Sequence, residues 1–292
     1  MRENAERELS RSSDRLSPRM SYTAAVSTFR SLTPFVGASI AWHLLALAAA
    51  VLVRGAAPWA LAAVALNHLV ITVAGLAPRS TLLGGNVSRL PAAAAARGEV
   101  AITIDDGPDP AVTPAVLDLL DAAGQRATFF CIADRVAEHP ALAREIVMRG
   151  HSIQNHTARH RHDFSFLGPK AYAEELGKAQ RILAKVSGQM PTCFRAPAGF
   201  RNMFLAPVLR RMGLTLVSWT RRGYDTRESD ATRVLERLTR GLAGGDILLL
   251  HDGNAARSPQ GRPVVLEVLP PLLAQLQAQG LRSVTLPQGL AS

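Results

Sequence analysis

The distribution of apolar residues divides the chain into a polar tail, an apolar region and a mixed remainder. Two long apolar stretches, Phe35 to Val53 and Pro58 to Leu76, contain no Asp, Glu, Lys or Arg. From Glu99 onward, short apolar runs alternate with longer amphipathic ones. This pattern predicts a polar Arg-rich tail over residues 1–34, a helical hairpin over residues 35–76, a linker over residues 77–98 and a folded domain over residues 99–292.

Each apolar stretch has nearly the length that a helix needs to cross about 30 Å of hydrocarbon. Residues 54–57 leave only a tight link between them, so we expect two transmembrane helices. Within them, His43, Asn67 and His68 are expected to pair with each other or to lie near the head groups. A cleaved signal peptide is disfavoured because a second apolar stretch follows the first. A buried helix pair in a soluble protein is the alternative.

The orientation follows from the basic residues. Two crossings put both ends of the chain on one side, and the Arg-rich tail favours the cytoplasm for that side. Arg79, Arg89 and Arg97 after the second stretch agree. We therefore expect a two-pass protein of a bacterial-type cytoplasmic (inner) membrane with a cytoplasmic catalytic domain, and an extracytoplasmic domain if only the first stretch crosses. Met20 offers a second plausible start of the chain.

Beyond residue 99 the pattern predicts an α/β fold. Alternation of short strands with helices is typical of a parallel sheet wrapped in helices, most simply a barrel, in which catalytic residues lie at the carboxyl ends of the strands. The expected strands cover about 100–104, 127–132, 152–155, 192–195, 215–219, 246–251 and 282–285. The expected helices run from Pro114 to Ala123, Pro140 to Arg149, Pro169 to Val186, Asp230 to Leu242 and Pro263 to Gln279.

Two adjacent carboxylates, Asp105 and Asp106, end the first of these strands. Neighbouring strand residues point to opposite faces, but the chain turns at the following Gly107-Pro108, so both carboxylates can converge on one cleft. Adjacent anions repel each other, and a metal ion bound by one, with the other left as a base, resolves the conflict. An acidic turn with a purely structural role is the alternative.

His156 and His160 follow the third strand with the spacing i, i+4. One helical turn would aim both imidazoles at a common point. Together with Asp106 they would hold a divalent ion and leave a site open for water, as in catalytic zinc sites. Zinc is the expected ion, and cobalt, nickel or iron suit the same ligands. His162 and Asp163 are expected to be loop or substrate-rim residues.

Two later strand ends carry further polar residues. Arg195 could hold a carboxylate through a charge-assisted pair, and the turn at Ala198 can present a backbone N–H to a developing oxyanion. His251 ends a fully apolar strand, a position suited to a general acid. Asp225 would keep His251 protonated and oriented. The alternatives are a surface Arg in an ordinary turn and a core or helix-capping His.

Taken in chain order, these residues resemble the motifs of the polysaccharide deacetylases of carbohydrate esterase family 4, the NodB homology domain. The likeness runs from about Glu99 to Thr285. It implies a distorted, incomplete (β/α) barrel of about seven βα units with a metal in its mouth, here preceded by two transmembrane helices. It assigns the base to Asp105, the metal ligands to Asp106, His156 and His160, the partner of the base to Arg195, the acid to His251, its tuning residue to Asp225, and the oxyanion N–H to Ala198.

The chain departs from this family at positions that line the cleft. Ile104 stands where the family often has Phe, Ala198 where it has Tyr, and Thr226 where it has Trp. No catalytic group is lost. The smaller side chains of Ala198 and Thr226 predict a cleft with different walls and a substrate unlike those typical of the family.

The resemblance implies a metal-dependent hydrolase that removes an N-acyl group, with acetyl expected, from an amino sugar in a membrane-associated glycan or a lipid-linked sugar. It includes enzymes that remove formyl groups from polyprenyl-phosphate-linked amino sugars, so formyl stays open. A cytoplasmic domain favours a polyprenyl-linked sugar, and an outer domain favours peptidoglycan or an exported polysaccharide. The alternative from another class is a catalytically silent membrane protein that binds carbohydrate.

Composition narrows the partners. The net charge is +10 over 292 residues, but the Arg residues are spread out, without a basic run or interleaved aromatic residues. We therefore expect no nucleic acid, and anionic phospholipid or a phosphate-bearing substrate suits the charge better. Cys131 and Cys193 lie in or beside apolar stretches and are expected to be buried free thiols.

Overall fold

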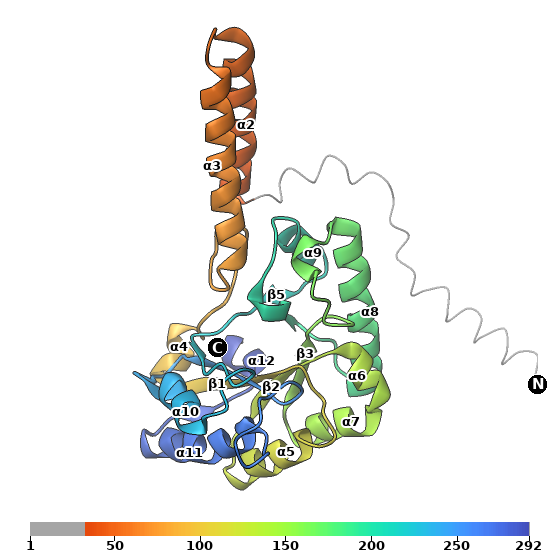
Figure 1. The fold of residues 1–292 in the computed structure, drawn as a ribbon. Coiled ribbons are helices and arrows are strands. Elements are labelled where there is room, and N and C mark those ends of the chain that lie inside the picture. The colour runs from red at the N-terminus through yellow and green to blue at the C-terminus, as the bar shows by residue number, and fades with distance from the viewer. Residues whose placement is uncertain (1–32, 292) are drawn as a thin grey trace, which may run out of the picture.

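The computed structural model describes residues 33–291. Residues 1–32 of the predicted tail, and the second start at Met20, lie outside the described residues. The described chain consists of a long helical hairpin and a larger α/β body, and the hairpin projects away from that body (Figure 1).

The hairpin consists of α2 (Pro34–Leu52) and α3 (Ala57–Leu76), within one residue of the two predicted helices. Polar groups pair between the helices: His43 Nε2 lies 3.2 Å from His68 Nε2, as expected, whereas Asn67 Oδ1 accepts from Ser39 Oγ, a partner that was not predicted. The apolar side chains mostly point outward, and only 11% of each apolar segment is buried. The alternative of a helix pair buried in the core of this chain is therefore wrong. Both helices are long and apolar enough to cross a membrane.

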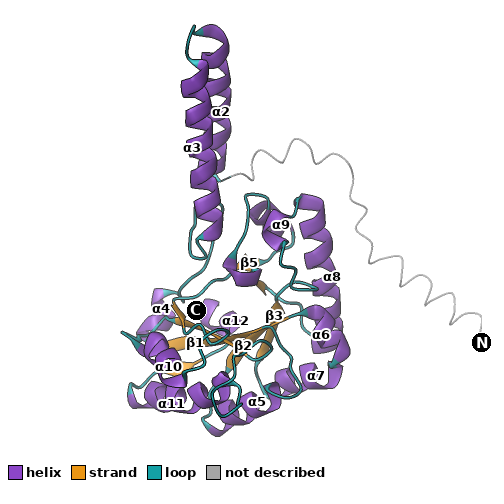
Figure 2. Ribbon diagram, viewed as in Figure 1, coloured by secondary structure: helices purple, strands orange, loops and turns teal. Residues whose placement is uncertain are grey.

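The body is built on a parallel sheet that curls into a half-barrel. Within residues 33–291 the strand order is β5-β4-β3-β2-β1-β7-β6, and β8 pairs with the start of β1. The strands are β1 (Glu99–Asp105), β2 (Ala127–Cys131), β3 (Ser152–Asn155), β4 (Cys193–Phe194), β5 (Thr215–Leu216), β6 (Arg221–Arg222), β7 (Ile247–His251) and β8 (Arg282–Ser283). The strands lie at the centre and the helices surround them (Figure 2). This confirms the predicted α/β fold, a distorted (β/α) barrel.

The helices of the body cover the outside of the sheet. They are α4 (Ala92–Ala96), α5 (Thr113–Ala122), α6 (Ala133–Glu138), α7 (Pro140–Met148), α8 (Pro169–Ser187), α9 (Leu205–Arg211), α10 (Ala231–Thr239), α11 (Val264–Ala278) and α12 (Leu286–Leu290). The side chain of Asp230 caps α10 by accepting from the backbone N–H groups of Thr232 and Arg233. Apolar side chains of β1, β2 and β7 pack against α5, α10 and α11 in the largest buried cluster.

Residues 77–98 connect the hairpin to the body and fold onto it. Val87 donates its N–H to Leu216 O of β5, and Leu90 donates to Gly245 O just before β7. These bonds connect the segment to the edge strand β5 and to the start of β7. The segment that composition marks as a linker thus satisfies edge groups of the sheet that would otherwise be unpaired.

The edge strands differ from the prediction. The strands expected at 192–195, 215–219 and 282–285 shorten to two residues each, and β6 was not predicted. Arg221 and Arg222 of β6 pair with Leu248 and Leu249 of β7. A two-residue polar strand at an edge has no apolar alternation to reveal it.

Candidate active site

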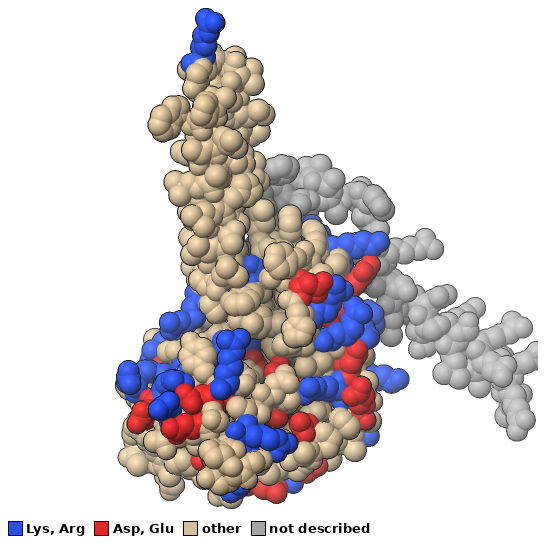
Figure 3. Space-filling view, viewed as in Figure 1, with Lys and Arg blue, Asp and Glu red and all other residues tan. Residues whose placement is uncertain are grey.

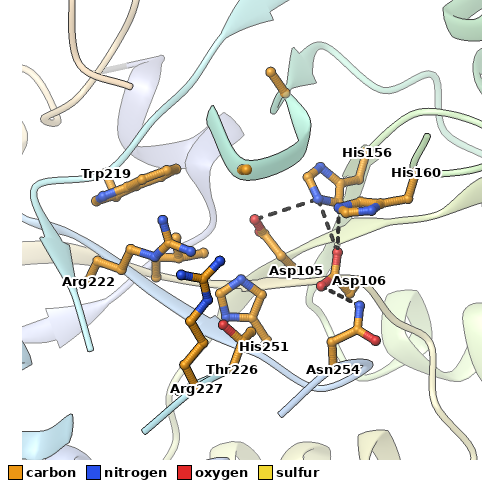
Figure 4. Close-up of a pocket in the computed structure, with 13 residues that line it drawn as sticks. Asp105, Asp106, His156, His160, Trp219, Arg222, Thr226, Arg227, His251 and Asn254 are labelled. Atoms are coloured by element: carbon orange, nitrogen blue, oxygen red, sulfur yellow. Dashed lines mark hydrogen bonds and ion pairs between the residues drawn. The ribbon is translucent and has the colours of Figure 1, made fainter. Parts of the chain in front are cut away.

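Six of the eight predicted site residues line one cleft at the carboxyl ends of the strands, and the other two, Arg195 and Asp225, are buried behind it. Asp105 at the end of β1 is directly opposite His251 at the end of β7. The cleft has a volume of about 200 Å³. Its lining residues include Asp105, Asp106, His156, His160, Ala198, Trp219, Arg222, Thr226, Arg227, His251 and Asn254 (Figure 4).

Asp106, His156 and His160 form a compact cluster whose ligand-type atoms all lie within 4.8 Å of one another. The Nε2 atoms of both histidines lie 3.2 Å from Asp106 Oδ1. That oxygen is buried and accepts no hydrogen bond from the described residues. Two imidazole nitrogens and a carboxylate oxygen facing one point fit a divalent cation with a further position open.

The groups around the cluster orient its side chains. His156 Nδ1 lies 2.8 Å from the backbone oxygen of Arg195, which leaves Nε2 facing Asp106. Asn254 Nδ2 donates to Asp106 Oδ2 at 2.8 Å. Arg135 donates to the backbone oxygen of Asp106. The turn itself uses an unusual backbone conformation, since φ of Asp106 is 76°.

Electrostatics favour positive charge at this point. Burial acts to raise the pKa of Asp106, but the adjacent imidazole of His156 outweighs this effect, and the pKa is held well below its usual range. Burial opposes protonation of His156, yet the adjacent Asp105 and Asp106 raise its pKa. Burial and the neighbouring His156 lower the pKa of His160 to about 4, so this imidazole is neutral at pH 7, as a metal ligand must be.

The two histidines do not lie on a helical turn. Residues 156–160 form an irregular loop after β3, with φ of 69° at Thr157 and 52° at His160. Two side chains hold this loop: Asn155 Oδ1 accepts from Thr157 N, and Thr157 Oγ1 accepts from His160 N. The expectation of a helical i, i+4 pair was therefore wrong, although the imidazoles do face a common point.

Asp105 and Arg195 form a fully buried ion pair, with Nη1 2.7 Å from Oδ1. The same guanidinium donates to Thr103 Oγ1 and to the backbone oxygen of Ser218, and it stacks 4.2 Å from the centre of the Phe130 ring. These contacts fix the guanidinium in one place. Asp105 Oδ2 remains 3.9 Å from His156 Nε2, on the cleft side.

His251 is held by Asp225 through two hydrogen bonds. Its Nδ1 lies 2.9 Å from Asp225 Oδ1, and its backbone N–H donates to Asp225 Oδ2 at 2.7 Å. Burial acts to lower the pKa of His251, but the charge and hydrogen bond of Asp225 outweigh it and raise the pKa to about 9. The imidazole is therefore protonated at neutral pH, and its Nε2 is the nitrogen left for the cleft.

Ala198 lies in the 3₁₀ turn Pro197–Gly199 at the mouth of the cleft, with φ of 54°. A side chain on the following residue would meet the foot of the hairpin: a Cβ at Gly199 would lie 2.6 Å from Pro78 Cβ and 2.8 Å from the Trp219 ring. The wall of the cleft that carries Ala198 is thus packed directly against the end of the hairpin.

Several lining residues were missed by the sequence analysis. Asn254 follows His251 by three residues, and Arg222 and Arg227 flank Asp225 on either side. Proximity to predicted site residues was the only signal for them. His162 and Asp163 lie in an exposed loop, where Asp163 pairs with Arg161, which agrees with the loop interpretation.

Cys131 and Cys193 are buried and free, as predicted. Burial raises the pKa of the Cys193 thiol to about 11. The thiol is therefore protonated at neutral pH.

Comparison with known proteins gives consistent matches. Residues 93–217 match the polysaccharide deacetylase family. The chain is 34% identical to a peptidoglycan-N-acetylglucosamine deacetylase of Bacillus cereus over 65% of this chain and 86% of that protein. It is 33% identical to a chitooligosaccharide deacetylase of Bradyrhizobium over 65% of this chain and 89% of that protein. The solved peptidoglycan N-acetylglucosamine deacetylase Bc1960 superposes with a TM-score of 0.65 and 26% identity, covering 71% of this chain and 94% of the other.

Proposed function

The chain belongs to the polysaccharide deacetylase family and is a deacetylase of amino sugars, and from that premise we propose that it removes the N-acyl group, acetyl in the first instance, from an amino sugar held at a membrane. One observation carries the proposal. One cleft is lined by a carboxylate that pairs with a buried guanidinium, by a carboxylate beside two imidazoles, and by an imidazole that pairs with a buried carboxylate. These are the groups that hydrolysis of an amide requires.

Asp106, His156 and His160 would hold the divalent ion, with zinc the first choice and cobalt, nickel or iron suited to the same ligands. A bound ion would supply Lewis-acid polarisation of the acyl carbonyl and acidification of water. Two hydrogen bonds would keep these ligands oriented. The backbone oxygen of Arg195 accepts from His156 Nδ1, and Asn254 Nδ2 donates to Asp106 Oδ2.

The remaining residues move protons and bind the oxyanion. Asp105 is the base: it takes a proton from the water that attacks the acyl carbon, while Arg195 fixes its position. The backbone N–H of Ala198 donates to the carbonyl oxygen as that oxygen gains negative charge. His251 Nε2 gives its proton to the sugar nitrogen as the carbon–nitrogen bond breaks, because an amide anion is too poor a leaving group. Asp225 orients His251 throughout.

The hairpin is the basis for placing the substrate at a bilayer. Its outward side chains, such as Leu47 at 63% and Leu52 at 80% exposure, would face water in a soluble protein. Insertion of both helices would remove that apolar surface from water. The hairpin forms a column without acidic or basic side chains except at its tip (Figure 3). A sugar on a polyprenyl carrier would then be presented beside the cleft.

The proposal is tested on the full chain in detergent or nanodiscs. We expect the purified protein to contain bound metal. We expect it to release a carboxylic acid and a free amine from N-acetylglucosamine oligomers or from polyprenyl-linked N-acetylated or N-formylated sugars. Comparing these substrates identifies the acyl group and the carrier. Asp105→Asn should retain the metal and lose about 10²–10⁴-fold in turnover, the usual range for a general base. Near-normal turnover of that variant, at full metal content, contradicts the role of Asp105. Carbohydrate binding without metal or turnover would favour a silent binding protein.

A further inference from the structure

Two cationic side chains in the cleft have no part in the steps above. Arg222 of β6 and Arg227 in the following loop both line the cleft. Figure 4 shows both guanidinium groups extending into it beside His251, on the side away from the Asp106, His156 and His160 cluster. They therefore lie where a group attached to the reacting sugar would be placed.

Neither guanidinium is neutralised by a carboxylate of the described part of the chain. Among residues 33–291, no carboxylate forms an ion pair with Arg222 or Arg227, whereas the neighbouring Arg237 pairs with Glu228. Asp225, the carboxylate between them in sequence, is fully buried and engaged with His251. Arg222 Nε is also buried without a hydrogen-bond acceptor in this part of the chain. Two like charges in one cleft with unused donors favour an anion from outside.

Arg222 is also held in place as a binding group should be. Its guanidinium carbon lies 5.1 Å from the centre of the Trp219 ring and 4.9 Å from that of Tyr224. Stacking on aromatic rings fixes the plane of the guanidinium and leaves its edge free for an oxyanion. Arg227, by contrast, is exposed and comes from the rim.

The position of these residues relative to the hairpin indicates where the anion comes from. Trp219, on which Arg222 stacks, packs close to Gly199 and Pro78, two residues beyond the end of α3. Arg79 donates to the backbone oxygen of Thr220 on the same wall. The cationic wall of the cleft is thus the wall that contacts the foot of the apolar hairpin.

We propose that Arg222 and Arg227 form an anion-binding subsite that recognises a phosphate attached to the N-acylated sugar, as in a lipid phosphate carrier. This inference rests on the proposed function and names the substrate class of the same cleft. The phosphate would sit at the membrane side, between the bilayer and the reacting acyl group.

The test compares matched substrates on the full, zinc-loaded chain in nanodiscs. The probes are neutral N-acetylglucosamine oligomers, N-acetylglucosamine 1-phosphate, polyprenyl-diphosphate N-acetylglucosamine, and N-acetylmuramic acid, which carries a carboxylate. We expect the phosphate-bearing probes to exceed the neutral one in kcat/KM by about 10- to 100-fold, mainly through KM. The double variant Arg222→Gln/Arg227→Gln should lose this preference, and Arg211→Gln, an exposed Arg outside the cleft, should keep it.

The outcomes separate the two proposals. Turnover of none of the probes contradicts the proposed function itself. Three results overturn the subsite while the proposed function stands. They are turnover without a preference for phosphate, a phosphate preference that survives the double variant, and a preference for the carboxylate probe alone. A preference for both phosphate probes supports recognition of phosphate itself, and one for the polyprenyl probe alone supports phosphate presented by the bilayer. If the double variant does not fold, Arg227→Gln gives the same comparison, because Arg227 is exposed; at least a threefold loss of the preference is expected.

Discussion

The hydrogen bond between Asp225 and His251 determines which imidazole nitrogen faces the cleft and when it carries a proton. The pKa of His251 is raised to about 9, so its acid form is present below that pH and is lost as the pH rises through it. A reaction that needs this proton loses activity on the alkaline side in the same window. The geometry therefore predicts a pH profile as well as a role.

We expect Asp225→Asn to move the alkaline limb of the pH–rate profile to lower pH. The substitution removes the anion that raises the pKa of His251, while burial continues to lower it. The measurement is kcat against pH for both proteins with the same metal. Asp105 and Asp106 also raise the pKa of His251, and a bound cation would offset their charge. It would therefore lower the alkaline limb in both wild type and variant, and the difference between the two proteins would remain. An alkaline limb at the same pH in wild type and variant would exclude His251 as the acid.

Asn254 provides a second test at the scale of single residues. Its side-chain amide donates to Asp106 Oδ2 from an exposed loop, at 2.8 Å. Asn254→Ala should weaken metal binding by about 10- to 100-fold, the usual cost of losing a hydrogen bond to a ligand. Competition with a chelator measures this directly, and thermal unfolding of the metal-free protein serves as the control. Unchanged metal affinity would show that Asp106 needs no such support.

Most of the candidate site residues could be predicted from the sequence because they follow apolar strands, although Asp225 follows the polar edge strand β6. Asp105 and His251 end β1 and β7, and parallel strands bring their ends to one edge. Arg222 and Asn254 could not be found this way, since their place in the cleft depends on a short edge strand and an irregular loop. The histidine pair shows the same limit: its spacing was informative, but the turn that positions it is set by side-chain hydrogen bonds of Asn155 and Thr157.

At the scale of elements, the central strands were predictable and the edges were not. β1, β2, β3 and β7 are continuous buried runs and match the predicted strands within one residue at each end. The edges depend on tertiary contacts, as where Val87 pairs with β5. The close approach of the hairpin foot to the turn at Ala198 was also invisible in the sequence, and it links two elements that would otherwise act separately.

That contact predicts a difference between two glycine variants. Gly199 and Gly124 both have positive φ, 78° and 63°, so alanine strains the backbone at either. Only at Gly199 would the new Cβ also collide with Pro78 and Trp219; at Gly124 nothing lies within 4 Å. Gly199→Ala should therefore lower the melting temperature more than Gly124→Ala, and it alone should reduce turnover. Equal effects of both variants on activity would show that the hairpin foot does not position the turn.

At the scale of the whole molecule, the side of the membrane on which the body lies decides which sugars can reach the cleft. The Arg-rich tail and the body lie at the same end of the hairpin if both helices cross. Arg54 is the only charged residue of the tight link between the helices, whereas the tail carries Arg2, Arg7, Arg11, Arg15, Arg19 and Arg30. If both helices cross, this bias predicts a cytoplasmic body, which a polyprenyl-linked sugar could reach and cell-wall polymer could not.

Reporter fusions test this arrangement without knowledge of the substrate. Alkaline phosphatase, active only outside the cytoplasm, should be active when inserted at Gly55, between α2 and α3, and inactive when fused after Ser292. A fluorescent protein that folds in the cytoplasm should give the reverse pattern. Phosphatase activity at the carboxyl terminus would place the body outside and make peptidoglycan or an exported polysaccharide the reachable substrate. The phosphate that Arg222 and Arg227 are proposed to bind would then have to belong to a molecule of the outer leaflet. The result of the fusions therefore limits which phosphate-bearing substrates need to be compared.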